Sequence, residues 1–293
     1  MKPAPFRYIP VRTISQALEL KAQHGDEARF LAGGQSLVPA MNFRLIQPAV
    51  LIDVNPIAEL SDISRTESGH LVIGALTRYR TIERDKACQD NLPLVAEALP
   101  YIAHPQIRNR GTIGGNLAHA DPASEMPAIV VALAGRLRAQ SVKRERWISA
   151  SDFFRGALST ALEPDEILAA VELPVATPRS GFCFLEVARR RGDFAIAGVA
   201  CMIQVDDDAR CVRARISLCN AADRPIFAAQ SSALLIGQTI AAAEIKEVAV
   251  LVQKEIDPAG SIHASKEFQR HIAGVLTERA LATAYERAHH GSR

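Results

Sequence analysis

The feature that most constrains this chain is a group of three glycines within five positions, Gly111, Gly114 and Gly115, inside the stretch Arg108–Glu125. Residues without a β-carbon let the backbone adopt conformations closed to other residues and let a ligand approach the N–H groups. Successive N–H groups in such a turn can converge on one point and bind an anion. The stretch therefore predicts a phosphate-binding turn. The alternative is a tight turn before a helix starting near Ser124, because glycine pairs are common in turns.

Polar side chains surround these glycines. The expected donors and cations are Thr112, Asn116, Arg108 and Arg110. Asp121 and Glu125 follow as two acceptors, which suit the hydroxyls of a sugar or ribityl chain. Asp121 precedes a proline and could instead be a turn residue, and Ser124 or Asp121 could be a helix cap.

A second glycine segment lies about eighty residues earlier, within Ala28–Val38. A short apolar strand ends at Gly33 and Gly34, and Gln35 and Ser36 precede a helical pattern. The order strand, glycine turn, hydroxyl and helix is typical of phosphate binding. The segment is neither a Walker A loop nor a Rossmann fingerprint. Two such segments predict one diphosphate bound from two sides.

Composition excludes several classes of protein. With 293 residues, 48% of them hydrophobic and 23% charged, the chain has the composition of an ordinary globular protein. Its net charge of +2 gives no indication of nucleic acid or of a stable membrane association. The N-terminus has no apolar signal, and the longest apolar run, Met126–Gly135, is too short to span a bilayer, so we expect a cytoplasmic protein. The five cysteines lack the spacing of an iron–sulfur or zinc site, so we expect no metal on this chain.

Hydrophobic periodicity predicts a glycine-rich α+β region to about residue 175, a linker at Pro174–Pro178 and a smaller α+β unit after it. Ser15 is the expected N-cap of a first helix that ends at Gly25. Strands are expected at 30–32, 50–54, 71–75, 136–141 and 167–173, and helices at 38–45, 92–103 and 128–134. Beyond the linker, strands are expected at 182–188, 195–205 and 212–218, and helices at 225–236, 241–255 and about 266–289.

Three motifs carry a family resemblance: Ala32-Gly-Gly-Gln-Ser36, Thr112-Ile-Gly-Gly-Asn116 and Arg189-Arg-Arg-Gly-Asp-Phe-Ala195. In this order and at these separations they resemble the FAD-binding medium subunit of the molybdenum hydroxylases, a family that includes aerobic carbon monoxide dehydrogenases and xanthine dehydrogenases. The resemblance covers nearly the whole chain. It implies an α+β fold in which a two-part, PCMH-type FAD-binding domain (1–175, with a small N-terminal α/β lobe at about 1–56 and a larger antiparallel-sheet lobe at 57–175) precedes a C-terminal domain (179–290) of a three-stranded antiparallel sheet with helices.

The resemblance also implies an oxidoreductase assembly. This chain would carry FAD and pass electrons from partner 2Fe–2S clusters to an external acceptor. The molybdenum cofactor would lie on a large molybdopterin-binding subunit and two iron–sulfur clusters on a small subunit, in a dimer of heterotrimers. No catalytic residue is assigned to this chain. The holoenzyme's substrate stays open, as does its acceptor among NAD, quinone, a carrier protein and oxygen.

The resemblance assigns the cofactor-binding residues position by position. The two glycine motifs match the family's flavin-binding loops, Glu125 falls where relatives carry an acidic residue beside the flavin, and Leu168 matches a position that lines the ring. Phe194 stands where relatives often have tyrosine; its ring can cover a flavin face but lacks the hydroxyl. Leu185 replaces a lysine of xanthine dehydrogenases, so the resemblance supports NAD less than the other acceptors. The cofactor-binding residues implied by the resemblance are Leu31, Ala32, Gly33, Gly34, Gln35, Ser36, Leu37, Ile102, Thr112, Ile113, Gly114, Gly115, Asn116, Asp121, Glu125, Leu168 and Phe194.

Two other functions are compatible with the motifs. One is a stand-alone FAD-dependent oxidase or reductase of PCMH-type fold, which would need a substrate acid and base that the sequence does not reveal. The other is a nucleotide-binding interaction module without catalysis. Reversible bleaching of a bound flavin by dithionite would argue against the module.

Overall fold

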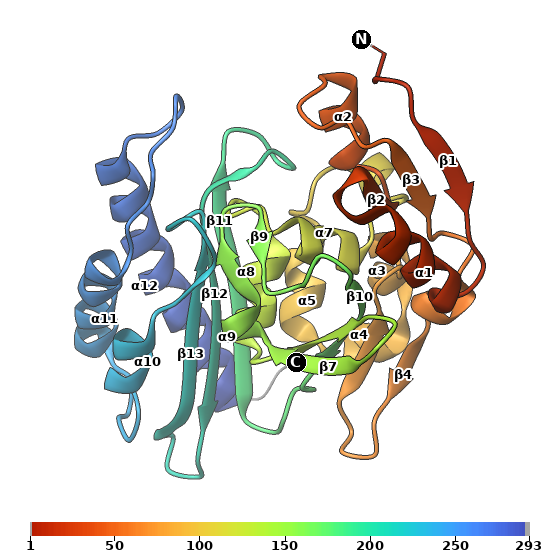
Figure 1. Ribbon diagram of the computed structural model, residues 1–293. Coiled ribbons are helices and arrows are strands. Elements are labelled where there is room, and N and C mark those ends of the chain that lie inside the picture. The colour runs from red at the N-terminus through yellow and green to blue at the C-terminus, as the bar shows by residue number, and fades with distance from the viewer. Residues whose placement is uncertain (1, 291–293) are drawn as a thin grey trace.

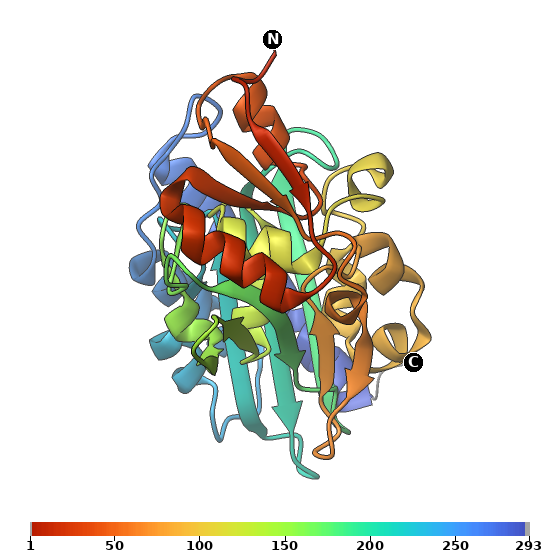
Figure 2. The ribbon, with the colours of Figure 1, turned by 45° about the vertical axis from the view of Figure 1, so that its right-hand side comes forward.

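The computed structural model describes residues 2–290, and the chain begins with a three-stranded parallel sheet (Figure 1). The strand order is β1 (Arg7–Pro10), β3 (Val50–Asp53) and β2 (Ala28–Leu31). All four residues of the central strand β3 are buried. Helix α1 (Ile14–His24) packs against β2 and β3, as the turned view shows (Figure 2), and α2 (Leu37–Asn42) follows β2.

The cap of α1 differs from the prediction. The Thr13 hydroxyl accepts a hydrogen bond from the N–H of Gln16 (3.2 Å), so Thr13 is the N-cap and the prediction of Ser15 is wrong. Gly25 ends the helix, as predicted, with a φ of 53°. A positive φ favours glycine because it has no β-carbon.

A five-stranded antiparallel sheet forms the centre of the molecule. Its order is β4 (Ile63–Arg65), β5 (Leu71–Gly74), β10 (Ile167–Leu173), β6 (Arg136–Gln140) and β7 (Glu145–Ser149). All seven residues of β10 are buried, since it is the central strand. The segments between these strands form α3 (Tyr79–Arg84), α4 (Lys86–Asn91), α5 (Pro93–Ala98), α6 (Pro105–Arg108), α7 (Ile113–His119), α8 (Glu125–Ala132) and α9 (Ala150–Phe153), with a small ribbon of β8 (Phe154–Gly156) and β9 (Ser159–Thr160).

The C-terminal part is an antiparallel sheet covered by helices on its outer face. Three long strands, β11 (Ser180–Ala188), β12 (Ala195–Val205) and β13 (Cys211–Cys219), occupy the predicted positions. A two-residue strand, β14 (Ile226–Phe227), adds a fourth, because Ile226 and Phe227 pair with the end of β13 instead of starting a helix at 225. The helices are α10 (Ala229–Leu234), α11 (Ala242–Glu255) and α12 (Lys266–His290). Within residues 2–290, no helix combines the length and the apolar character needed to cross a bilayer.

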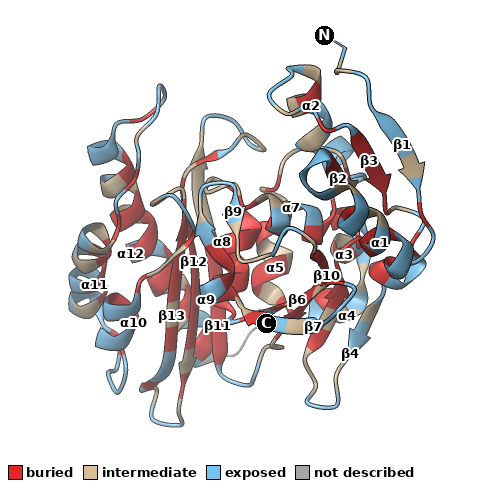
Figure 3. Ribbon diagram, in the orientation of Figure 1, coloured by how far each residue is buried: buried red, intermediate tan, exposed pale blue. Residues whose placement is uncertain are grey.

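The two large sheets share one hydrophobic core. Helices α5 and α8 lie between them and pack against β11 and against β12 and β13, respectively (Figure 1). All eight residues of α8 are buried, and Figure 3 shows this helix in red between the two sheets. Phe182 and Phe184 of β11 belong to the same core cluster as the strands of the five-stranded sheet. The C-terminal sheet is therefore held against the rest by apolar burial.

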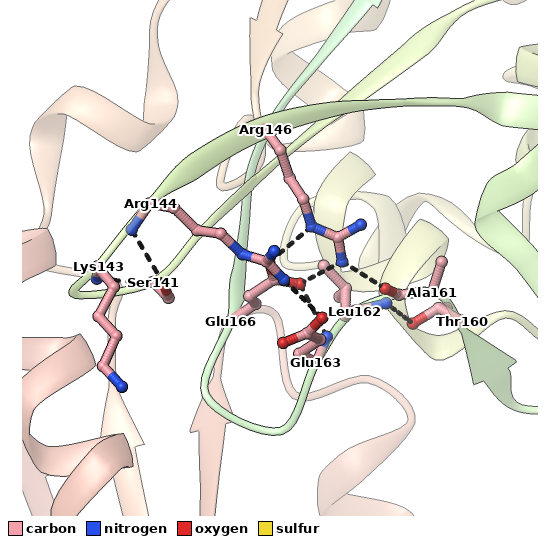
Figure 4. Close-up of polar contacts among 9 residues, drawn as sticks. All are labelled: Ser141, Lys143, Arg144, Arg146, Thr160, Ala161, Leu162, Glu163 and Glu166. Carbon is pink, nitrogen blue, oxygen red and sulfur yellow. Dashed lines mark hydrogen bonds and ion pairs between the residues drawn. The ribbon is translucent and has the colours of Figure 1, made fainter.

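An ion-pair network fixes the segment that leads into β10 (Figure 4). The guanidinium of Arg146 donates to both carboxylate oxygens of Glu166 (2.8 and 2.7 Å) and to the carbonyl of Ala161 (2.7 Å). Arg144 pairs with Glu163, whose backbone N–H donates to Glu166 (2.8 Å). These contacts tie the β6–β7 hairpin to the loop before β10 and so position Leu168 on that strand.

Candidate functional site

The two glycine segments lie in direct contact. A β-carbon placed on Gly33 would lie 2.5 Å from the carbonyl oxygen of Arg110 and 2.9 Å from the Cα of Gly111, distances too short for a real side chain. A β-carbon on Gly115 would lie 3.7 Å from the β-carbon of Ala32. The structure therefore brings together the two segments that the sequence predicted to act as one site.

The first segment offers a row of unpaired backbone donors. Within residues 2–290 we find no hydrogen-bond acceptor for the N–H groups of residues 33–37. Gly34 has a φ of 71°, which bends the backbone between β2 and α2, and the side chain of Gln35 donates to the carbonyl of Gly33 (3.1 Å). Unpaired consecutive N–H groups at a strand-to-helix turn fit an anionic diphosphate.

The second segment is the start of a helix, and its donors are already used. The predicted turn at 112–116 is wrong: Thr112 is the N-cap of α7, and its hydroxyl accepts from the N–H of Gly115 (3.0 Å). The N–H of Ile113 donates to Thr77 (3.1 Å) and that of Gly114 to Ala75 (2.9 Å). This segment therefore packs against the first segment and supplies no free N–H at residues 113–115.

Gly114 owes its place to packing. A β-carbon on Gly114 would lie 2.3 Å from the β-carbon of Ala75, just after β5. Glycine is needed here for close approach of α7 to the sheet, and not for a left-handed backbone.

Two polar residues predicted at the site, Asn116 and Asp121, have partners inside the protein. The amide of Asn116 and the hydroxyl of Ser124 bond to each other (2.7 and 3.0 Å), which joins α7 to the start of α8. Asp121 accepts from the N–H of Ala123 (2.9 Å), as expected of a turn residue, and lies in the loop between these helices.

Arg108 does not supply charge to the glycine segments. It is buried, donates to the carbonyls of Ile102 (3.0 Å) and Ala103 (2.9 Å), and lies 3.6 Å from the carboxylate of Glu83. The expectation that it would face an anion is wrong, because its guanidinium closes the preceding loop. The side chain of Arg110 is exposed.

Glu125 begins α8 and is 5% exposed. Burial, with a contribution from Asp121, raises its pKa to about 7. Glu186 of β11 lies near it: burial and the charge of Glu125 raise the pKa of Glu186 to about 8, and its buried Oε2 has no hydrogen-bond partner within the described chain. Burial and Glu125 also raise the pKa of Tyr79. Such perturbed groups gather at functional sites.

Sequence reasoning missed Glu186 and Tyr79. For Glu186 a signal was present, because residues two apart share a face of a strand, and Phe182, Phe184 and Glu186 alternate on β11. A carboxyl that continues an apolar row indicates a buried acid.

The apolar residues predicted to bind the cofactor differ in exposure. Ile102, Ile113 and Leu168 all belong to the largest core cluster and are 5%, 0% and 5% exposed. Phe194 is 69% exposed. Its loop rests on the segment around Ile102, because a β-carbon on Gly192 would lie 2.7 Å from the ring of His104.

The comparisons with known proteins agree with this geometry. Residues 4–176 match the family model of the FAD-binding domain in molybdopterin dehydrogenase, and residues 182–284 match that of the CO dehydrogenase flavoprotein C-terminal domain. The chain belongs to the molybdopterin dehydrogenase FAD-binding family. The resemblance inferred from the motifs is confirmed, and so are the predicted α+β, PCMH-type fold, the FAD-binding function and the oxidoreductase class.

Three relatives illustrate the range of this family. The chain is 38% identical to the 6-hydroxypseudooxynicotine dehydrogenase complex subunit alpha of Paenarthrobacter nicotinovorans over 98% of its length and 97% of the relative's. It is 39% identical to caffeine dehydrogenase subunit beta of Pseudomonas sp. (strain CBB1), over 99% and 98%. The structure of carbon monoxide dehydrogenase from Hydrogenophaga pseudoflava superposes with a TM-score of 0.95 at 34% identity, covering 98% of this chain and 99% of that one.

Proposed function

We propose that this family member binds FAD with its diphosphate on the N–H groups of residues 33–37. The observation that carries the proposal is the row of unpaired donors closed on one side by Arg110 and Gly111. The remaining residues carried over from the family, from Ile102 to Phe194, would surround the sugar and the ring, except Ile113 and Gly114, which are buried and act through packing. When bound, FAD accepts single electrons and discharges one or two. This chain would bind FAD, orient it and shield it from water.

We infer that the chain acts in a larger complex. Relatives are named as subunits or medium chains, and the matched structures include a Cu,Mo-CO dehydrogenase. The proposed partners are a large molybdopterin-binding subunit and a small subunit with two 2Fe–2S clusters, assembled as a dimer of heterotrimers. The proposed division of this chain is 1–175 for FAD binding and 179–290 for the C-terminal domain. All five cysteines are free thiols, which supports a cytoplasmic location.

Co-purification tests this proposal. The chain would be expressed with its neighbouring genes, and the complex analysed for FAD, molybdenum and iron. We expect one FAD per copy of this chain, bleached by dithionite and restored by an acceptor, together with two partner polypeptides. An active flavoprotein monomer that oxidises a small molecule without partners would instead support the stand-alone oxidase or reductase.

A further inference from the structure

Asn55 links the end of β2 to the rest of the site. Its amide nitrogen donates to the carbonyls of Ala32 (2.9 Å) and Leu31 (3.2 Å), the last two before the unpaired N–H groups. The same nitrogen, and the backbone N–H of Asn55 (3.0 Å), donate to Asp53. The hydroxyl of Tyr8 donates to the other oxygen of Asp53. These contacts fix the orientation of the amide and leave its oxygen facing away from β2.

Arg78 completes a closed circuit of hydrogen bonds and close contacts that joins the two glycine segments. One guanidinium nitrogen donates to the side-chain oxygen of Asn55, and the other donates to the backbone carbonyl of Arg110. That carbonyl oxygen is the atom that a β-carbon on Gly33 would meet. The circuit therefore runs from Ala32 through Asn55, Arg78 and Arg110 back to Gly33.

The circuit also holds positive charge beside the unpaired donors. Burial, and the neighbouring Arg110, lower the pKa of Arg78, while Asp53 opposes this shift. An arginine stays charged in proteins even so. An anion bound beside Gly33 would relieve the repulsion between the two guanidinium groups.

We propose that Asn55 and Arg78 are positioning residues, which together hold the first glycine segment at the distance from the second that FAD binding requires. The proposal rests on the proposed function, because it assigns FAD to this site. The two side chains join the lobe of the parallel sheet to the lobe of the five-stranded sheet. Replacing either one should break the same connection, so their effects on FAD affinity should not add. Neither needs to touch the cofactor.

A double-mutant cycle on the full chain tests the proposal. The dissociation constant of FAD would be measured by titrating flavin-free protein, with thermal unfolding of the same samples as the test of folding. The variants are Asn55→Ala, Arg78→Met and their combination. Arg78→Lys keeps the charge but cannot donate to two acceptors in the same fork geometry. Arg84→Met, at the exposed end of α3, is the matched control.

We expect each single variant to weaken FAD binding by about tenfold or more, because each breaks a hydrogen bond that involves a charged group. The double variant should be about as weak as Arg78→Met alone, Arg78→Lys intermediate and Arg84→Met within about twofold of the wild type. Single-variant effects that multiply in the double variant would overturn the proposal. So would wild-type affinity in folded Arg78→Met. Wild-type chain that binds no FAD would refute the proposed site instead.

Discussion

Gly33→Ala is expected to weaken FAD binding strongly, because the new β-carbon would collide with the second glycine segment. The backbone φ of Gly33 lies outside the positive range, so alanine is excluded here by space and not by backbone strain. The carbonyl oxygen of Arg110 lies 2.5 Å from the β-carbon position and must retreat by at least 0.5 Å to reach 3.0 Å, the lower limit of real contacts. The Cα of Gly111, at 2.9 Å, must move with it.

The magnitude follows from the cost of overpacking. Inserting a methyl group into a packed site costs about 1–3 kcal/mol. If the flavin-free chain relaxes by moving the segments apart, FAD must restore their spacing, and the dissociation constant rises by about 5-fold to about 150-fold. Titration of flavin-free protein measures this constant, with unfolding by urea as the test of overall stability.

Gly156→Ala is the matched control. Its added β-carbon in β8 would meet only the side-chain end of Asp223, at 3.3 Å, and no atom of either glycine segment lies within 4 Å of it. We expect its FAD affinity to equal that of the wild type. A folded Gly33→Ala chain whose affinity is within about twofold of the wild type would refute the reasoning, because the contact between the segments would then have no part in binding.

Two further predictions concern buried carboxyl groups. Glu166→Ala should lower the free energy of unfolding by about 1–3 kcal/mol at neutral pH, because it removes the acceptor of two hydrogen bonds from the partly exposed Arg146 and of one from the N–H of Glu163. The exposed ion pair between Arg144 and Glu163 should contribute under about 1 kcal/mol. Urea unfolding of Glu166→Ala and Glu163→Ala checks both values. Arg146 lowers the pKa of Glu166, so this stabilisation is present above about pH 4.5 and is lost as the pH falls through the lowered value. Glu186→Gln should show the opposite trend. Burial raises the pKa of Glu186 to about 8, so its neutral carboxyl favours the folded state. This contribution to the free energy of unfolding is fully present below about pH 4.5 and is lost as the pH rises through 8. The variant should therefore match the wild type near pH 4.5 and exceed its stability near pH 9, and parallel profiles would contradict this.

Local patterns predicted much of the fold. The strands at 167–173 and 195–205 have the predicted bounds, because Pro174 and the acidic turn at 206–208 end their apolar runs clearly. The contact between the two glycine segments was also predicted, from the repeated order of strand, glycine and polar residues.

Contacts between distant residues explain what the sequence did not reveal. Gly114 was predicted to be part of a turn, but the structure requires glycine there because Ala75 packs directly against it. Arg108 was expected to be a free cation, but it is buried, donates to two loop carbonyls and pairs with Glu83. The linking roles of Asn55 and Arg78 depend on two lobes meeting, which no local pattern encodes.

The most direct test of the account is amide hydrogen exchange, resolved by residue, in the full chain with and without FAD. Residues 33–37 have unpaired N–H groups, so we predict fast exchange without FAD and strong protection with it. Residues 113–116 already donate within the protein and should change little. Exchange at residues 33–37 that FAD leaves unchanged would contradict the claim that these groups bind the diphosphate.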